Sequence, residues 1–154
     1  MPTITLSNIE LDTIQIISNL RQIVNQCCSV KDVKRSTNTS SEINFEGVVG
    51  EYAFCKYYNL FLDITPSPRS GGYDCVYEDK RVDIKTTHYK NGRLICTMKE
   101  NNQVDIYVLA ILEKNLVTLV GWAYKDELID SRNIQDLGYG NTYVLDQNKL
   151  RTMF

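Results

Sequence analysis

The chain has 154 residues, of which 43% are hydrophobic and 23% charged, and its formal net charge is −2. This length and composition predict one soluble globular domain, and the acidic balance excludes a domain that holds nucleic acid through diffuse positive charge. No apolar run reaches the roughly 20 residues of a membrane-spanning helix, and no basic region opens a signal peptide, so we expect a cytoplasmic protein without a membrane partner.

The N-terminal part of the chain predicts one long helix followed by a polar loop. Apolar residues recur at helical spacing over residues 14–24, which predicts a helix over about residues 7–28. Ser7 or Asn8 is the expected N-cap. The polar run over about residues 31–41 is typical of a loop.

Five cysteines are distributed along the chain without any Cys-x-x-Cys pair. Their odd number and the absence of paired spacing favour reduced thiols in an intracellular protein over a disulfide framework. A zinc site is not expected, because His88 is the only histidine that could join the thiols.

A second helix is predicted over residues 46–58. Gly47, Gly50 and Glu51 lie on one face of it at i, i+3, i+4 spacing. Glycine in a helix costs about 1 kcal/mol relative to alanine, so two glycines on one face indicate a close approach to another element. The sequence therefore predicts that this face, with Glu51 on it, packs against the sheet.

The next segments predict a short strand over 60–64, a proline- and glycine-rich loop over 66–72, and a β-hairpin over 74–87. If the hairpin turns at Glu78 and Asp79, residues 77 and 80 lie opposite each other.

Continuing this register places Asp74 opposite Asp83 on neighbouring strands. Lys85, two residues after Asp83, shares its face. Two carboxylates facing each other repel, so the pattern predicts a positive group between them, and a divalent cation with oxygen ligands is the obvious candidate.

The remaining elements complete a sheet. Asn91 and Gly92 carry the strongest short hairpin signal, and the apolar run 105–112 is typical of a central strand buried on both faces. Together the elements predict an α/β (α+β) domain with a central mixed β-sheet flanked by helices. The other expected elements are strands over 93–98 and 116–122, a helix over 125–129, and an edge strand over 141–145 followed by a turn capped by Asp146.

Three motifs occur in a fixed order: Gly-x-x-Gly-Glu-x-Ala-Phe around Glu51, Gly-Gly-Tyr-Asp ending at Asp74, and Asp-x-Lys at Asp83 and Lys85. In this order the chain resembles the PD-(D/E)XK nuclease superfamily, including its small phage-type and restriction-type endonucleases, and the resemblance covers about residues 45–87. It departs from the superfamily name at Tyr73, which stands where that name has proline. No Gln-x-x-x-Tyr helix of the exonuclease-like members is found.

The resemblance implies a restriction-endonuclease-like core and a metal-dependent, endonucleolytic deoxyribonuclease. Glu51, Asp74, Asp83 and Lys85 are its expected catalytic residues. Glu51, Asp74, Asp83 and the backbone carbonyl of Ile84 are the expected ligands of Mg²⁺, for which Mn²⁺ can substitute. The implied substrate is DNA, and a homodimer is a further possibility. A junction resolvase or an RNase using the same site, and a catalytically silent DNA-binding or inhibitory module of the same fold, stay open as alternatives.

An acidic chain needs a local basic surface to hold DNA, because phosphate contacts dominate nucleic-acid affinity. The residues expected to form it lie around the predicted site: Arg69, Lys90, Arg93 and Lys99, with Lys31, Lys34 and Arg35 from the polar loop as further candidates.

Each candidate also has an ordinary structural interpretation. Asp74 alone is a turn aspartate, Asp83 and Lys85 alone are a surface ion pair, and Glu51 alone is an exposed helix charge. Structural roles are favoured for the weaker site candidates, which are His88, Glu46 and Asp105.

Overall fold

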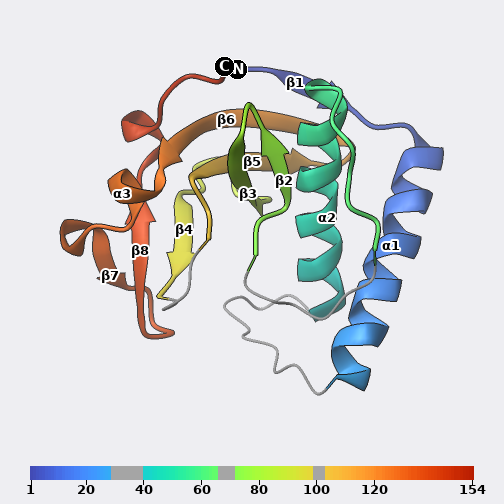
Figure 1. Cartoon of the computed structure of the whole chain (residues 1–154), viewed down its shortest axis with the longest axis horizontal. Helices are drawn as coiled ribbons and strands as arrows, with labels where there is room; N and C mark the ends of the chain where they lie inside the picture. The colour runs from blue at the N-terminus through green and yellow to red at the C-terminus, as the bar shows by residue number, and fades with distance from the viewer. Residues whose placement is uncertain (29–39, 66–71, 99–102) are drawn as a thin grey trace.

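The computed structural model describes residues 1–28, 40–65, 72–98 and 103–154 of the chain, and it contains two sheets and two long helices (Figure 1). The larger sheet has five strands in the order β1-β6-β5-β3-β2, and the smaller has three in the order β4-β8-β7. β3 runs parallel to β5, and the other neighbouring pairs run antiparallel. The elements are β1 (Thr3–Thr5), α1 (Asn8–Cys27), α2 (Ser40–Tyr57), β2 (Cys75–Tyr77), β3 (Lys80–Thr87), β4 (Leu94–Thr97), β5 (Ile106–Glu113), β6 (Leu116–Tyr124), α3 (Lys125–Leu128), β7 (Ile134–Asp136) and β8 (Asn141–Leu145), with short 3₁₀ turns at Ser131–Asn133 and Gln147–Lys149.

The predicted mixed α+β class is confirmed: a curled mixed sheet is flanked by helices. α2 packs on β3 of the large sheet, and α1 packs on α2 at the periphery (Figure 1). The small sheet and α3 lie on the other side of the large sheet (Figure 1). No helix in the described ranges is long and apolar enough to cross a membrane.

β5 is the central strand that the apolar run predicted. Val108 and Ala110 belong to the core on the α2 side, whereas Tyr107 and Leu109 belong to the core on the side of the small sheet. Alternate side chains of a strand point to opposite faces, so a strand covered on both faces needs an uninterrupted apolar run.

α1 begins where the sequence predicted. Ser7 is the N-cap, and its hydroxyl accepts a hydrogen bond from the backbone N–H of Glu10. The Glu10 carboxylate accepts one from the backbone N–H of Ser7 at 2.8 Å, which completes a capping box. The Lys56 ammonium of α2 also lies 2.6 Å from Glu10. The start of α1 is thereby tied to the end of α2.

α2 begins at Ser40, six residues earlier than the predicted start. The prediction of a close glycine contact is confirmed at Gly50, where an added Cβ would lie 1.9 Å from Thr86 Oγ1 and 3.4 Å from Ile84 Cγ2. It is wrong at Gly47, where an added Cβ would meet nothing within 4 Å. Gly50 therefore sets the distance between α2 and β3.

The hairpin between β2 and β3 has the predicted register. Tyr77 pairs with Lys80 and Cys75 with Val82. Glu78 and Asp79 have φ of 46° and 60°, the two positive values that a two-residue type I′ turn requires.

Three predictions about the strands are wrong. β8 (Asn141–Leu145), predicted as an edge strand, lies between β4 and β7 in the small sheet. The segment 60–64 belongs to neither sheet. Gly92 closes a turn by donating its N–H to the Tyr89 carbonyl, but β4 then pairs with β8 in the small sheet, so β3 and β4 do not form a hairpin. The sequence analysis also missed β1 and β7, which are only three residues long and give little periodicity.

An aromatic cluster joins the last residues of the chain to β6. Trp122 donates its indole N–H to the Thr152 carbonyl at 2.8 Å, and its ring centroid lies 4.8 Å from that of Phe154. The Arg151 guanidinium lies 5.4 Å from the centroid of the Trp122 ring. These contacts hold residues 151–154 against the edge of the core.

Candidate functional site

Asp83 and Lys85 project from the middle of β3 on the face away from α2. Ile84, between them, belongs to the core under α2, so the alternation of the strand directs Asp83 and Lys85 to the opposite face. Their side chains form an ion pair, with Lys85 Nζ 2.6 Å from Asp83 Oδ1. Asp83 is buried, with 9% of its surface exposed.

Asp74 lies directly before β2, at the point where this edge strand begins. The paired register ends at Cys75 and Val82, and the backbone N–H of Asp74 donates to the Val82 carbonyl at 2.8 Å, so Asp74 lies beside β3 but is not paired with Asp83. Its Oδ2 accepts a hydrogen bond from the backbone N–H of Ile84 at 2.6 Å. The N–H and C=O of one residue in a strand point to the same edge, so the Ile84 carbonyl also faces the edge that Asp74 occupies.

Glu51 enters from α2, and its partner is a residue that the sequence analysis missed. Arg21 of α1 donates from Nη1 to Glu51 Oε2 at 2.7 Å and from Nη2 to the Asp63 carbonyl at 2.8 Å. Both side chains are largely buried, with 25% and 12% of their surfaces exposed. Arg21 could have been identified from the sequence, because it lies four residues after Ile17 and therefore on the inner face of α1.

Burial and neighbouring charges raise the pKa of two carboxyl groups of the site, Asp74 and Glu51. Burial raises the pKa of Asp74 well above its ordinary value, and the negative charges of Glu51 and Asp83 raise it further. Burial also raises the pKa of Glu51, against the opposing effect of Arg21. Burial alone would lower the pKa of Lys85, but Asp83 and then Asp74 raise it above its ordinary value. The four predicted catalytic residues therefore lie within electrostatic reach of one another.

With all groups ionised, the site holds three carboxylates, Glu51, Asp74 and Asp83, against two cations, Lys85 and Arg21. One negative charge is left uncompensated among buried groups, which is unfavourable without a further positive group. The donors are carboxylate oxygens and one carbonyl, which suit a hard divalent cation such as Mg²⁺.

The described residues contain no group of three acidic, histidine or cysteine side chains arranged to hold a metal ion. Each carboxylate has a different partner instead: Glu51 binds Arg21, Asp74 binds the Ile84 N–H, and Asp83 binds Lys85. The donor set fits a divalent cation chemically, and its side chains are engaged in ion pairs and a hydrogen bond.

The predicted basic surface is described only in part. Lys90 is exposed in the turn after β3. Arg93 donates to Gln135 Oε1 at 3.0 Å and lies 4.0 Å from Asp146 Oδ1, so an acidic neighbour offsets its charge. Outside the described residues lie Arg69, Lys99, Lys31, Lys34 and Arg35.

His88 and Glu46, two of the weaker candidates, pair with each other. His88 Nδ1 lies 3.2 Å from Glu46 Oε1, which joins the end of β3 to α2. The pair lies beyond Thr86 and Gly50 along the same packed elements, which agrees with a structural role.

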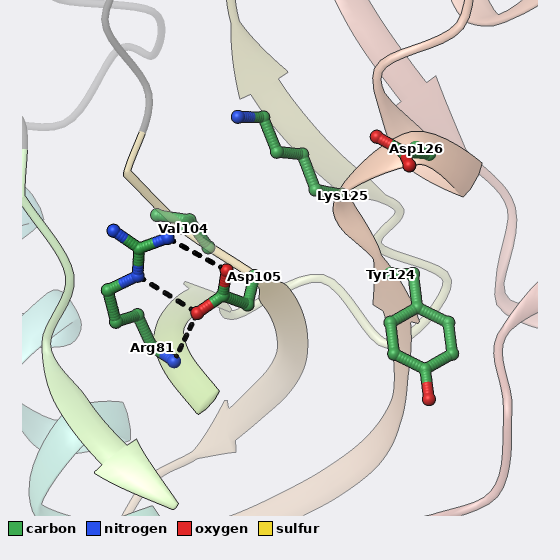
Figure 2. Close-up of a pocket in the computed structure, with 6 residues that line it drawn as sticks. All are labelled: Arg81, Val104, Asp105, Tyr124, Lys125 and Asp126. Atoms are coloured by element: carbon green, nitrogen blue, oxygen red, sulfur yellow. Dashed lines mark hydrogen bonds and ion pairs between the residues drawn. The ribbon is translucent and has the colours of Figure 1, made fainter. Parts of the chain in front are cut away.

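Asp105, the third weaker candidate, has a structural partner at the start of β3. Its carboxylate accepts hydrogen bonds from Arg81 at Nε, Nη2 and the backbone N–H, each between 2.8 and 2.9 Å (Figure 2). The side-chain hydrogen bonds to Arg81, followed by the backbone one, lower the pKa of Asp105. The pair lines an open surface pocket of about 320 Å³ together with Val104, Tyr124, Lys125 and Asp126.

Two buried thiols lie directly beside the site. The side chains of Cys55 and Cys75 are hydrogen bonded, which lowers the pKa of Cys55 and raises that of Cys75. Cys55 lies one helical turn after Glu51, and Cys75 follows Asp74. All five cysteines of the chain are free.

A comparison with known protein families defines the class of the chain. Residues 5–116 match the model of a family described as a family of unknown function, DUF5843. The match covers more than half of the chain and includes Glu51, Asp74, Asp83 and Lys85, so the chain belongs to this family. No curated protein and no solved structure matches it.

Proposed function

We propose that the protein is a metal-dependent nuclease that hydrolyses phosphodiester bonds in DNA. The observation that carries the proposal is the convergence of Glu51, Asp74, Asp83 and Lys85 at the edge where β2 begins. Two carboxyl groups with raised pKa, Glu51 and Asp74, beside the Asp83–Lys85 ion pair are the kind of arrangement expected at a catalytic site.

The local backbone also supports the proposal. The hairpin brings Asp74 next to β3, and the Gly50 contact brings the helix that bears Glu51 close to the same strand. This order of helix, hairpin and acidic strand agrees with the resemblance to the PD-(D/E)XK superfamily. A restriction-endonuclease-like core is part of the proposal.

In the proposed mechanism, Asp74, Asp83 and the Ile84 carbonyl hold Mg²⁺ or Mn²⁺, and Glu51 completes the ligand set. A bound divalent cation polarises the scissile phosphate and lowers the pKa of a water molecule. The Lys85 ammonium orients the attacking water and stabilises the negative charge that develops on the phosphate. To act as a metal ligand, Asp83 would have to give up its ion pair with Lys85.

We further propose that Lys90 and Arg93, with Arg69 and Lys99, contact the DNA backbone. Arg69 precedes Asp74 in the chain, and the other three residues follow Lys85. Lysine and arginine can contact phosphate groups whatever the base sequence. A cytoplasmic location is consistent with free thiols, since reducing compartments preserve them.

A second candidate is a DNA-binding or inhibitory module that has the same arrangement without catalysis. The ion pairs Arg21–Glu51 and Lys85–Asp83 favour it, because they occupy groups that a metal ion requires.

The two candidates differ in a cleavage assay. The purified protein is incubated with supercoiled, linear, branched and single-stranded DNA, and with RNA, in Mg²⁺, Mn²⁺ or EDTA. We expect metal-dependent cleavage of DNA that Asp83→Asn abolishes, whereas Asp105→Asn, which alters a carboxylate outside the site, leaves it unchanged. Binding without cleavage under every metal condition would support the silent module. Cleavage restricted to branched DNA or to RNA would reassign the substrate.

A further inference from the structure

The outer face of α1 carries a row of exposed aliphatic side chains. Ile9, Ile16, Leu20 and Ile23 expose 78%, 62%, 45% and 54% of their surfaces. Their positions follow the 4-3 alternation of a helix that packs lengthwise against another helix. The α1 stripe is defined here as Ile9, Thr13, Ile16, Leu20, Ile23 and Cys27.

α1 is apolar on two sides rather than one. Its inner face buries Ile14 and Ile17 in the core beside α2. Leu20 belongs to the apolar run over residues 14–24 that predicted this helix, but its side chain is exposed on the outer face. A surface helix that packs on one side normally shows charged residues on the other, and a helix that is apolar on both sides is normally buried on both.

The exposed face of α1 is also nearly uncharged. Ten residues of α1 are exposed, and Asp12 is the only charged one among them. Almost a quarter of the whole chain is charged. A face of this composition is poorly suited to contact with water alone and suits contact with an uncharged, apolar surface.

The chain itself offers little to cover this face. α2 contacts the opposite side of α1 (Figure 1). Among the residues that the structure does not describe, 29–39, 66–71 and 99–102, Val30 and Val33 are the only aliphatic ones. Two valines are too few to cover four large aliphatic side chains over the length of the helix.

We propose that the α1 stripe binds the α1 stripe of a second copy of this chain, with the two helices antiparallel. The 4-3 spacing of the stripe is what such a partner needs, and α1 itself is a helix with that spacing. Along the stripe the spacing alternates between four and three residues. In an antiparallel pair, Ile9, Ile16 and Ile23 of one helix face Cys27, Leu20 and Thr13 of the other. Ile16 then packs on Leu20 of the partner subunit, and Thr13 on Ile23 of the partner subunit. A two-fold axis closes the contact, so assembly stops at a dimer.

Charge and area both support this occupant. Asp12 is the one charged residue on the exposed face of α1. Parallel helices would place the Asp12 side chains of the two subunits beside each other, whereas antiparallel helices keep them apart. A helix of 20 residues is about 30 Å long, and a pair along that length gives an interface near the lower end of specific complexes, about 1,200 Å². We therefore expect a weak, concentration-dependent dimer.

Sedimentation velocity over about 1 to 100 µM protein tests the proposal, since this range brackets a micromolar dissociation constant. Wild-type protein is expected to shift from monomer to dimer. Ile16→Glu should weaken association about 100-fold, because each of the two copies loses roughly a factor of ten. The matched control is Ile134→Glu on β7, an exposed isoleucine on the far side of the molecule from α1 (Figure 1). It should dimerise like the wild type.

Folding is checked on the same samples by circular dichroism, and Ile23→Gln serves as a milder second variant. A wild type that stays monomeric throughout the range overturns the proposal. So does a dimer that Ile16→Glu and Ile23→Gln both leave intact.

The orientation has its own test. Ile16→Glu and Leu20→Lys proteins, each monomeric alone, are mixed in equal amounts. In an antiparallel pair the new glutamate faces the new lysine, so the mixture should regain association. A mixture that remains monomeric, when each single variant is folded, contradicts the antiparallel arrangement.

Discussion

Two groups of charged residues include side chains of β3, and their surroundings differ in a way that bears on function. At the start of the strand, Arg81 and Asp105 satisfy each other with three hydrogen bonds, are exposed by 40% and 37%, and keep Asp105 ionised by lowering its pKa. In the middle of the strand, Asp83 and Lys85 lie among further buried carboxylates.

The second group has the opposite electrostatics. Burial and the neighbouring charges raise the pKa of Asp74, so its ionised form opposes folding. A balanced, exposed ion pair stabilises the fold slightly, whereas a crowded group of buried charges destabilises it. The first group is therefore a structural charge pair. The second group lowers the stability of the fold, and the proposed catalytic function gives a reason for retaining it.

Removal of catalytic groups is expected to give the largest effect. Asp83→Ala and Lys85→Ala should each reduce metal-dependent DNA cleavage by at least about 10³-fold, since each removes a group that acts on the reacting phosphate or on the metal. Asp83→Ala should also weaken Mg²⁺ binding, measured by calorimetry, whereas Lys85→Ala should leave binding nearly intact. Unchanged cleavage by folded Asp83→Ala protein would make the two groups on β3 equivalent and end the nuclease proposal.

The next effect concerns the close approach of α2 to β3. Gly50→Ala should destabilise the fold by about 2 kcal/mol in urea denaturation, because the new methyl group overlaps Thr86 Oγ1. Thr86 Oγ1 is itself buried and has no hydrogen-bond partner in the described part of the chain. Adding Thr86→Ala removes the overlapping oxygen, so the double variant should recover much of the loss. Gly47→Ala is the control and should be neutral or slightly stabilising. Equal changes in stability for both variants would contradict the idea that the close contact at Gly50 limits the approach of α2 to β3.

Asp74→Asn tests the sign of the site's electrostatics. The folded-state pKa of Asp74 is raised above its ordinary value of 3.8, so the wild type loses stability as pH rises from that value through the raised one. Asparagine retains an acceptor for the Ile84 N–H but carries no charge. In metal-free protein at pH 7 the variant should be more stable by about 1 kcal/mol, and the gain should shrink toward pH 4. A variant less stable than wild type at pH 7 would contradict the crowding argument.

Asp105→Asn should give the smallest effect and the opposite sign. The pKa of Asp105 is lowered in the folded state, so its contribution is present above the ordinary value of 3.8 and disappears as pH falls below it. At pH 7 the melting temperature should fall by about 2 °C, because the pair is exposed and worth little. A rise in the melting temperature at that pH would remove the contrast between the two groups.

The local parts of this fold were predictable from sequence. The type I′ turn at Glu78 and Asp79 fixes the register of two adjacent strands, and that register brings Asp74 next to β3. The cap at Ser7 and the apolar run of β5 likewise depend on neighbouring residues. Such features follow from short-range geometry and periodicity.

The parts that depend on distant residues were not predictable. β4 pairs with β8, about 50 residues further along the chain, so the Asn91–Gly92 turn does not form a hairpin. Arg21 meets Glu51 only because α1 packs on α2, a contact across 30 residues. No local pattern specifies such pairs; tertiary packing decides them.

The position of Trp122 has a practical consequence for spectroscopy. It is the only tryptophan in the chain, and its indole N–H binds the Thr152 carbonyl while Phe154 and Arg151 lie close to its ring. Its fluorescence emission therefore responds to the seating of residues 151–154 on β6. Release of that segment would expose the indole to water and shift the emission to longer wavelength, whereas local changes at the distant end of α1 would leave it unaltered. The protein thus contains an intrinsic optical probe for one of its edges, with no label required.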